Sequence, residues 1–508
     1  MPAIMFQGTG SSVGKSLLVA GLCRAMYLRG LSVAPFKPQN MSNNAAVSSD
    51  GGEIGRAQAL QARAAHLSAH TDMNPVLLKP ESETGAQIIV HGKRFATAKA
   101  REYGQLKSQL LPVVMESFRR LETAYDLVLV EGAGSPAEIN LRAGDIANMG
   151  FAQAAQIPVI LIGDIDRGGV IAQIAGTKMV ISDEDASLVH GFIINKFRGD
   201  VSLFDDGYRQ IEQLTGWSGF GVVPYFPDQW KLPAEDGMDM ARKITEGQSA
   251  QTAGTDKIHT GKIHTGQIHI VCLKLSRIAN FDDLDPLVLE PKVKVTMLDA
   301  GQPISGDADL VIIPGSKSTI ADLKFITEQG WDIDLMAHHR RGGHIVGICG
   351  GYQMLGRRIT DPQMIESSQT EIDGLGLLDI ETEMTGHKQL AEVRARHIAS
   401  GVELSGYEIH IGKTSGRDTN RPVMKILSEG KEVEDGAISQ SGRIWGCYLH
   451  GMFSDDSFRH HLLESLGKNV AGQTMANYEQ QIEDTLDDLA RHLEDTLDID
   501  RLISCASR

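Results

Sequence analysis

Short apolar runs alternate with stretches of helical periodicity along most of the chain. In the first half, runs with the length and character of buried strands lie at 3–6, 32–36, 86–90, 126–130, 158–163, 191–194 and 220–224. Helical patterns separate several of these runs, most clearly at 17–28, 57–67 and 102–121. Buried strands that alternate with helices are typical of a parallel sheet covered by helices on both faces. The first half is therefore predicted to form a doubly wound α/β domain.

The same alternation returns in the second half of the chain. Strand-like runs lie at 269–273, 294–298, 310–313, 344–348 and 444–449, and a helical pattern follows at 455–466. These runs predict a second doubly wound α/β domain. A last segment, 475–503, has an acidic amphipathic helical pattern that is expected to dock or pair with another element.

Hydrophobic periodicity is lost between residues 243 and 267, where Gly, Thr, Gln and Ser predominate. A repeat of Lys-Ile-His-Thr-Gly places His259, His264 and His269 five positions apart. This spacing fits neither one helix face nor strand alternation, and no cysteine or carboxylate cluster accompanies it. A flexible connector is therefore favoured over a metal site. The predicted organisation is a first domain at 1–243, a linker at 244–267, a second domain at 268–468 and an acidic helical tail at 469–508.

Composition argues against several classes of protein. The 508 residues carry a formal net charge of −16, which disfavours nonspecific binding to nucleic acid or to an anionic membrane surface. The five cysteines are scattered, without the spacing of a disulfide framework or a zinc site. No apolar run approaches the roughly 20 residues of a membrane span, and the N-terminus lacks the pattern of a signal peptide. We therefore expect a cytoplasmic protein, whose oligomeric state does not follow from the sequence.

The segment 8–16, with the sequence GTGSSVGKS, joins the first predicted strand to the first predicted helix. A glycine-rich turn at this place cradles phosphate groups with backbone N–H groups and the helix N-terminus. Gly10 and Gly14 would allow close approach, Lys15 would supply positive charge, and the Ser16 hydroxyl would reach a magnesium ion. An ordinary turn rich in glycine and serine is the alternative, because Thr9 stands where the usual spacing has glycine. A nucleotide site is favoured.

Further candidates lie at the carboxyl ends of predicted strands, where ligands bind in such sheets. Lys37 follows the second strand and begins the polar segment 37–44, for which a solvated loop is the alternative. Glu131 ends the fourth strand, and a carboxylate beside a phosphate loop is placed to coordinate magnesium. A capping role for Glu131 is the alternative. Asn195 ends the sixth strand and is a candidate to read the nucleotide base.

The second half contains a candidate cysteine nucleophile. Cys349 lies between the strand at 344–348 and a short helical pattern, in the sequence GICGGYQ. A nucleophile at a sharp strand-to-helix turn needs small neighbours, and a following helix N-terminus favours the thiolate. A buried structural cysteine is the alternative. Backbone N–H groups at Gly315 and Gly350 are expected to form an oxyanion hole.

A cysteine nucleophile needs a base, usually a histidine far along the chain. His450 is favoured because it ends the strand-like run at 444–449 and precedes a glycine. His410 is the second choice, and a structural role for it is equally open.

These motifs resemble two known families. The pattern Gly-x-Cys-x-Gly-x-Gln at 347–353 is similar to the nucleophile elbow of class I glutamine amidotransferases, with Pro314 and Gly315 in the place of their oxyanion strand. The loop at 8–16 has the Gly-Thr-x-x-x-Val-Gly-Lys-Ser/Thr form of dethiobiotin-synthetase-like ATPases. Fused in this order, and with KPQNMSNN at 37–44 and EIGRAQ at 53–58, they resemble the cobyric acid synthase family of cobalamin biosynthesis.

The resemblance implies a ligase that depends on ATP and Mg²⁺ and uses a corrinoid and glutamine as substrates. It would amidate the b, d, e and g carboxylates of adenosylcobyrinic acid a,c-diamide through an acyl phosphate, with ammonia released by Cys349 and His450. Class I relatives usually carry His-x-Glu, whereas Met452 takes the place of the glutamate in this chain. Another group, or none, must then orient His450.

Two alternatives share parts of this pattern. Cobyrinic acid a,c-diamide synthase resembles the chain in architecture and is separated from it by the segments 39–44 and 53–58. A partitioning-type ATPase switch with an inactive amidotransferase-like domain would usually carry an extra lysine early in the phosphate loop and a basic surface. The glycines at 8 and 10, the acidic charge and the intact motif around Cys349 disfavour the switch.

Overall fold

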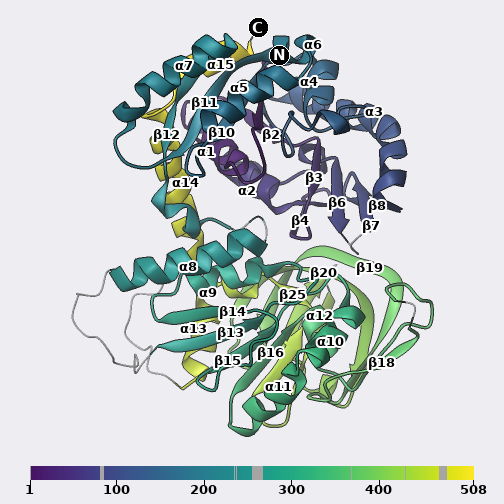
Figure 1. The fold of residues 1–508 in the computed structure, drawn as a ribbon. Helices are drawn as coiled ribbons and strands as arrows, with labels where there is room; N and C mark the ends of the chain where they lie inside the picture. Colours follow the sequence, from purple (N-terminus) through teal and green to yellow (C-terminus); the bar gives the residue numbers. More distant parts are fainter. Residues whose placement is uncertain are drawn as a thin grey trace. The chain divides into compact units, whose positions relative to one another are not determined.

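In the computed structural model, the chain folds into two compact units. Unit 1 comprises Met1–Leu232 and Ile482–Arg508, and unit 2 comprises Pro233–Gln481. The structure describes residues 2–80, 85–233, 235, 237–253, 267–367, 369–428, 431–467 and 477–507. Each unit is built on a wholly or mainly parallel sheet with helices packed on it (Figure 1), which confirms the predicted fold class.

The main sheet of unit 1 has six parallel strands in the order β12-β11-β10-β1-β9-β2. These strands are β1 (Ala3–Gly8), β2 (Val33–Phe36), β9 (Leu127–Glu131), β10 (Val159–Asp164), β11 (Val189–Phe197) and β12 (Ser218–Pro224). The helices are α1 (Lys15–Leu28), α2 (Arg56–Ala64), α3 (Ala100–Ala124), α4 (Met149–Ala155), α5 (Val170–Val180), α6 (Asp183–Leu188) and α7 (Asp205–Thr215), with short turns at η1 (Thr71–Met73), η2 (Ile139–Leu141), η3 (Val201–Phe204) and η4 (Pro227–Lys231). Six of the seven predicted strands of this half belong to the main sheet.

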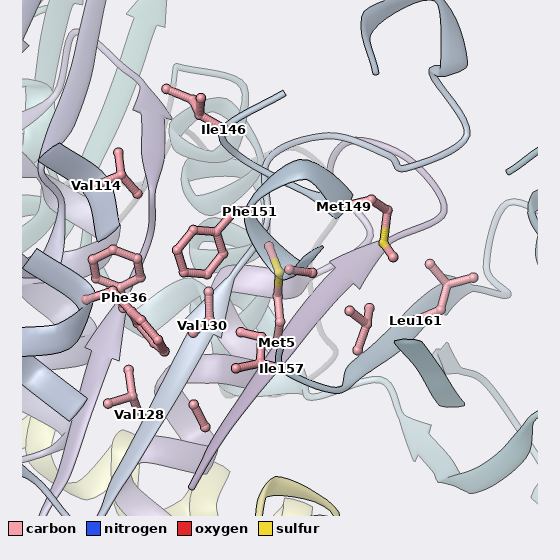
Figure 2. Packing of buried hydrophobic residues seen from close by; sticks show 14 of the residues in the cluster. Met5, Phe36, Val114, Val128, Val130, Ile146, Met149, Phe151, Ile157 and Leu161 are labelled. Atoms are coloured by element: carbon pink, nitrogen blue, oxygen red, sulfur yellow. The ribbon is translucent and has the colours of Figure 1, made fainter. Parts of the chain in front are cut away.

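One face of this sheet is covered by an apolar cluster to which α3 and α4 contribute. Alternate strand residues point to opposite faces, so Val128 and Val130 of β9 enter the same cluster (Figure 2). The rings of Phe36, Phe118 and Phe151 lie 5.3 to 5.5 Å apart between centroids. Full burial of such side chains stabilises a fold by about 1.5–3 kcal/mol each. This packing fixes the carboxyl ends of β2 and β9, which carry two of the predicted site residues.

Two smaller sheets lie between β2 and α3 in the sequence. One has the order β3-β6-β7-β8 and the other is the hairpin β4–β5. Their strands are β3 (Gln39–Met41), β4 (Ala45–Val47), β5 (Glu53–Gly55), β6 (Val76–Pro80), β7 (Gly85–Val90) and β8 (Lys93–Lys99). The segment 37–44 is therefore not simply a solvated loop, because β3 pairs with β6 and the amide of buried Asn40 donates to Gln58 Oε1 at 2.9 Å.

The acidic tail folds onto unit 1 from Ile482 onward. Its helices are α14 (Tyr478–Glu494) and α15 (Ile499–Ala506). Leu489 and Leu493 of α14 approach α1 closely, since a Cβ at Gly21 would lie 2.7 and 2.6 Å from their side-chain carbons. Glu483 pairs with Arg24 and, at 2.7 Å, with Arg63. The expected docking of the tail is thus observed from Ile482 onward, where its apolar and acidic faces both meet partners in unit 1.

The main sheet of unit 2 has six strands in the order β14-β13-β15-β16-β24-β23, of which only β23 runs antiparallel to its neighbour. The strands are β13 (Ile268–Leu273), β14 (Val293–Leu298), β15 (Leu310–Ile313), β16 (His344–Ile348), β23 (Ala437–Ile438) and β24 (Ile444–Cys447). The helices and short turns are α8 (Gly237–Ala253), η5 (Phe281–Leu284), α9 (Asp285–Val288), α10 (Thr319–Glu328), α11 (Trp331–Arg340), α12 (Gly350–Met354), η6 (Asp418–Asn420), η7 (Met452–Ser454) and α13 (Asp456–Ser465).

A second sheet of unit 2 brings the chain back past the nucleophile turn. It has seven strands, with the order β18-β17-β19-β20-β25, and β21 pairs with β19 on one side and with β22 on the other. The strands are β17 (Arg358–Thr360), β18 (Glu371–Asp373), β19 (Ile380–His397), β20 (Glu403–Gly416), β21 (Met424–Ser428), β22 (Lys431–Asp435) and β25 (Leu449–His450). The predicted strand at 444–449 is thereby split: β24 belongs to the main sheet and β25 to this one.

The predicted linker at 244–267 is wrong over its first part. Residues up to Ala253 continue helix α8, which begins at Gly237 and belongs to unit 2. Met240 and Ile244 of this helix are buried, and Gln248 donates to the carbonyl of Val295 at 2.7 Å. Tertiary packing thus stabilises a helix whose polar composition alone gave no clear period. The histidine repeat at 257–266 lies outside the described residues.

Candidate active sites

The phosphate loop of unit 1 has the backbone that its sequence requires. It runs from β1 into α1, with Ser12 and Gly14 in the left-handed region at φ of 57° and 94°. A Cβ at Gly8 would lie 2.8 Å from the carbonyl oxygen of Gly10, so a side chain there would disrupt the loop. Lys15 folds back over the turn, where its Nζ donates to Gly10 O at 3.0 Å and to Gly134 O at 3.2 Å. The positively charged Nζ of Lys15 is therefore held beside the turn whose N–H groups are predicted to bind phosphate.

Three of the predicted site residues meet at one buried carboxylate. Glu131 is fully buried at the end of β9, where it accepts hydrogen bonds from Ser16 Oγ at 2.7 Å and from Lys37 Nζ at 2.8 Å. Gln61 of α2 donates to the other carboxylate oxygen at 2.6 Å. Gln61 was missed in the sequence, where the available signal was a second glutamine three positions after Gln58 in an alanine-rich helical pattern.

These oxygens fit the needs of a magnesium ion. Mg²⁺ prefers hard oxygen ligands and commonly takes one or two from the protein and the rest from phosphate and water. The adjacent Ser16 hydroxyl and Glu131 carboxylate supply such a pair at the mouth of the loop. Both residues remain the predicted metal ligands.

Asn195 is hydrogen-bonded to the backbone of the phosphate loop. Its Nδ2 donates to the carbonyl of Val13 at 2.8 Å, and a Cβ at Gly14 would lie 2.4 Å from the same nitrogen. The neighbouring Lys196 reaches Ser12 O and Asp164 Oδ2, at 2.5 and 2.9 Å. Base reading by Asn195 stays a prediction, beside this observed role in shaping the loop.

In unit 2, Cys349 lies on a strained turn between β16 and α12. Its backbone has φ 53° and ψ −108°, an unusual conformation for a residue with a side chain. The turn is crowded: a Cβ at Gly347 would lie 2.6 Å from Gly351 O, and one at Gly351 would lie 2.0 Å from Ile313 O. The glycines of the motif are thus needed because backbone segments pass within contact distance of each other. This is the geometry of a nucleophile elbow.

His450 is held by a carboxylate that the sequence did not identify. Its Nδ1 lies 2.8 Å from Asp283 Oδ2, and Asp283 Oδ1 accepts the Gly451 N–H at 2.6 Å. Both side chains are almost completely buried. Burial alone would lower the pKa of His450, but the Asp283 carboxylate and then Cys349 raise it to about 10.

Asp283 takes the orienting role that the glutamate of His-x-Glu has in class I relatives and that Met452 cannot fill. It lies in η5, far from His450 in sequence, within the acidic run 282–285. That run was the only available signal, and it is ambiguous because acidic residues are common in surface turns. The ring of Tyr407 stacks on His450 at 5.1 Å between centroids, and Asn280 Nδ2 donates to Tyr407 Oη at 2.9 Å. Asp283 therefore holds the imidazole at its Nδ1 edge, and Tyr407 covers one of its faces.

The two predicted oxyanion glycines lie beside His450 and Cys349: Gly315 is close to the His450 ring, and Gly350 follows Cys349 in the chain. A Cβ at Gly315 would be 3.0 Å from His450 Cε1, and a Cβ at Gly350 would be 3.0 Å from the backbone nitrogen of Ser316. Their N–H groups as an oxyanion hole remain a prediction. His410, the second choice for the base, instead stacks on Tyr448 at 3.7 Å between centroids. The geometry favours His450.

Two further observations concern metals and membranes. Among the described residues, no group of three or more His, Cys, Asp or Glu side chains is arranged to hold a metal ion. His269, the last member of the histidine repeat, is bonded to Asp307 and Thr296 at 2.9 Å each. Within the same part of the chain, every helix is too short or too polar to cross a membrane.

Comparison with known families assigns each half to a class. Residues 4–237 match the CobQ/CobB/MinD/ParA nucleotide binding domain, and residues 269–458 match the CobB/CobQ-like glutamine amidotransferase domain. The chain therefore joins a nucleotide-binding domain to a glutamine amidotransferase domain. A solved glutamine amidotransferase matches over 39% of this chain and 97% of its own, with a TM-score of 0.29 and 16% identity.

Full-length relatives define the family. A cobyric acid synthase from Jannaschia sp. (strain CCS1) is 60% identical over 99% of this chain and 98% of its own length. One from Rhodobacter capsulatus is 59% identical over 100% of both chains. The chain belongs to the cobyric acid synthase family, whose members are glutamine-hydrolysing, amide-forming ligases of cobalamin biosynthesis.

Proposed function

We propose that this protein amidates the b, d, e and g carboxylates of adenosylcobyrinic acid a,c-diamide, with ammonia from glutamine and energy from ATP. The observation that carries the proposal is the buried Cys349, His450 and Asp283 arrangement in the same chain as a phosphate loop beside a buried carboxylate. One site is suited to releasing ammonia, and the other is suited to activating a carboxylate.

Unit 2 would hydrolyse glutamine. Cys349 attacks the side-chain amide carbon, and the oxyanion that forms is bound by the N–H groups of Gly315 and Gly350. His450, which takes up the thiol proton of Cys349, then protonates the amide nitrogen so that it leaves as ammonia, and a thioester remains on Cys349. Water, deprotonated by His450, cleaves the thioester to glutamate. Asp283 keeps the His450 ring in the tautomer and orientation that these proton transfers require.

Unit 1 would activate the substrate carboxylate. The N–H groups of the loop, including those at Gly10 and Gly14, hold the phosphates of ATP, and Lys15 offsets the charge that develops on the γ-phosphoryl group. Ser16 and Glu131 would hold Mg²⁺, which supplies further charge neutralisation on the phosphates. A carboxylate oxygen takes the γ-phosphoryl group, and ammonia displaces phosphate from the acyl phosphate. Because ammonium cannot act as a nucleophile, ammonia must arrive unprotonated.

The choice of corrinoid is supported by the relatives and by two sequence segments. The relatives are named for cobyric acid, and the segments 37–44 and 53–58 carry the resemblance to them. Lys37 and Gln58 from these segments both reach the carboxylate of Glu131, at 2.8 and 3.5 Å. The segments that favour this substrate therefore adjoin the predicted ATP and magnesium site.

Two measurements test the proposal. Purified protein is incubated with ATP, glutamine and either cobyrinic acid or its a,c-diamide, and the added amides are counted by mass spectrometry. We expect four additions to the diamide. Two additions to cobyrinic acid with none to the diamide would assign the protein to the diamide synthase reaction instead.

The second measurement separates the two sites. Cys349→Ala should abolish glutamine-dependent amidation and leave amidation with added ammonium salt, because ammonia bypasses the nucleophile. Lys15→Ala should abolish both. Loss of both activities in a folded Cys349→Ala protein would contradict the roles proposed for the two units.

A further inference from the structure

A buried ion pair lies next to the element that carries Asp283. Lys243 of α8 contacts Asp285 with 2.6 Å between Nζ and Oδ1, and the two side chains are 3% and 0% exposed. Burial lowers the pKa of Lys243, while Asp285 and then Asp282 oppose that shift. A pair this deeply desolvated is poorly tolerated when one partner is removed, because the other charge is then left buried without compensation.

The three carboxylates of the acidic run 282–285 each contact a residue from a different element. Tyr407 of β20 donates to Asp282 at 3.3 Å, His450 of β25 pairs with Asp283, and Lys243 of α8 pairs with Asp285. Asp283 and Asp285 are two positions apart, with only Leu284 between them, and they lie on either side of the junction of η5 with α9. A backbone shift at Asp285 would therefore also move Asp283.

Helix α8 is itself firmly placed in unit 2. Met240 and Ile244 are buried on either side of Lys243, and Gln248 donates to the carbonyl of Val295 in β14. Lys243 thus reaches Asp285 from a packed helix. The proposed glutaminase reaction assigns no role to this pair, although it is as buried as the His450 and Asp283 pair.

We propose that Lys243 is a positioning residue for glutamine hydrolysis, because its pairing with Asp285 fixes the 282–285 turn so that Asp283 stays in register with His450. This proposal rests on the glutaminase role proposed for Cys349, His450 and Asp283. It extends the amidotransferase machinery to a helix that precedes the glutamine amidotransferase match at 269–458.

The test compares Lys243→Met with the wild-type full-length protein. Methionine keeps a long apolar side chain and removes the charge. We expect kcat for glutamine hydrolysis to fall by about tenfold with KM for glutamine changed less than about twofold, because orientation of the base affects the proton transfers more than binding. Ammonia-dependent amidation should stay within about twofold of wild type in the same preparation. The rate of Cys349 alkylation by iodoacetamide at neutral pH should fall in parallel.

Matched variants make the result specific. Lys274 forms a pair with Asp299 at the same 2.6 Å, but the two side chains are 44% and 59% exposed, so Lys274→Met should leave both activities unchanged. The double variant Lys243→Met/Asp285→Asn removes both buried charges and the pairing together, so it should keep the selective loss of glutamine hydrolysis, whereas recovery would assign the defect of Lys243→Met to the unpaired Asp285 charge. If Lys243→Met does not fold, the double variant and Asp285→Asn are measured instead, and both are expected to show the selective loss.

Three outcomes would overturn the proposal. They are wild-type glutamine hydrolysis in Lys243→Met, equal loss of ammonia-dependent amidation, and recovery of glutamine hydrolysis in the double variant. Failure of the underlying function would look different, since glutamine hydrolysis would then persist in Cys349→Ala.

Discussion

Asp283→Asn isolates the contribution of the carboxylate that holds His450. Asp283 is a pure acceptor that receives two N–H groups, from His450 Nδ1 and Gly451 N, at 2.8 and 2.6 Å. Asparagine of the same shape has one acceptor oxygen and one NH₂ group. If its oxygen keeps the Gly451 N–H, its NH₂ faces Nδ1 and forces the tautomer with hydrogen on Nε2. That tautomer cannot accept a proton from Cys349.

The expected decrease in kcat/KM for glutamine follows from the strength of the hydrogen bond between His450 and Asp283 that the substitution removes. A hydrogen bond to a buried charged group contributes about 1.5–3 kcal/mol, which converts to a decrease of about 10- to 150-fold in kcat/KM for glutamine. The His450 and Asp283 side chains are 1% and 3% exposed, so water does not screen or replace the bond. We therefore expect the upper part of that range.

The assay measures glutamate release and amide formation in one preparation. Glutamine hydrolysis and glutamine-dependent amidation should fall together, while amidation with added ammonium salt stays at the wild-type rate. Asp299→Asn makes the same chemical change at an exposed position of unit 2 and should alter neither activity. A rate of glutamine hydrolysis within twofold of wild type in Asp283→Asn would refute the reasoning, because it would mean that His450 needs no carboxylate.

Three further predictions concern the other elements of the two sites. Glu131→Gln should abolish amidation with either nitrogen source, and added Mg²⁺ should not restore it, since the Glu131 carboxylate is proposed to hold the metal ion beside the phosphates; amidation restored by Mg²⁺ would contradict this. Because the folded-state pKa of His450 is raised from 6.5 to about 10, the stability that this group provides is fully present below pH 6.5 and is lost as pH rises through about 10. Urea unfolding at pH 7 and above pH 10 should show this loss in wild type and not in Asp283→Asn. Leu489→Ala should cost about 2–5 kcal/mol in the free energy of unfolding of unit 1, because Leu489 is 1% exposed where α14 packs on Gly21; a change below 1 kcal/mol would show that the C-terminal helix is not part of that core.

Local patterns were sufficient for much of the fold and for part of each site. Strand ends are readable because a buried strand is a continuous apolar run, and the residue after it stands at the edge where ligands bind. Lys37, Glu131 and Cys349 were found in this way, and the structure brings Lys37 and Ser16 each within hydrogen-bond distance of Glu131.

The boundary of unit 2 and the partners of the tail were not readable in the same way. Helix α8 has a polar composition, and its placement depends on Met240, Ile244 and Lys243 meeting partners distant in sequence. The tail is acidic because Glu483 and Glu494 pair with arginines of unit 1, at Arg24, Arg29 and Arg63. Such pairings depend on contacts that no local period records.

Residues adjacent in the chain encode the nucleotide loop, the nucleophile turn and the two α/β units, so these features could be predicted from local sequence. The group that orients His450 could not be predicted in this way. Asp283 lies 167 positions away and its sequence context is an ordinary acidic turn, so nothing local distinguishes it from Asp282 or Asp285. A hydrogen bond is specified by distance and direction in space, and the fold alone brings that carboxylate to that ring.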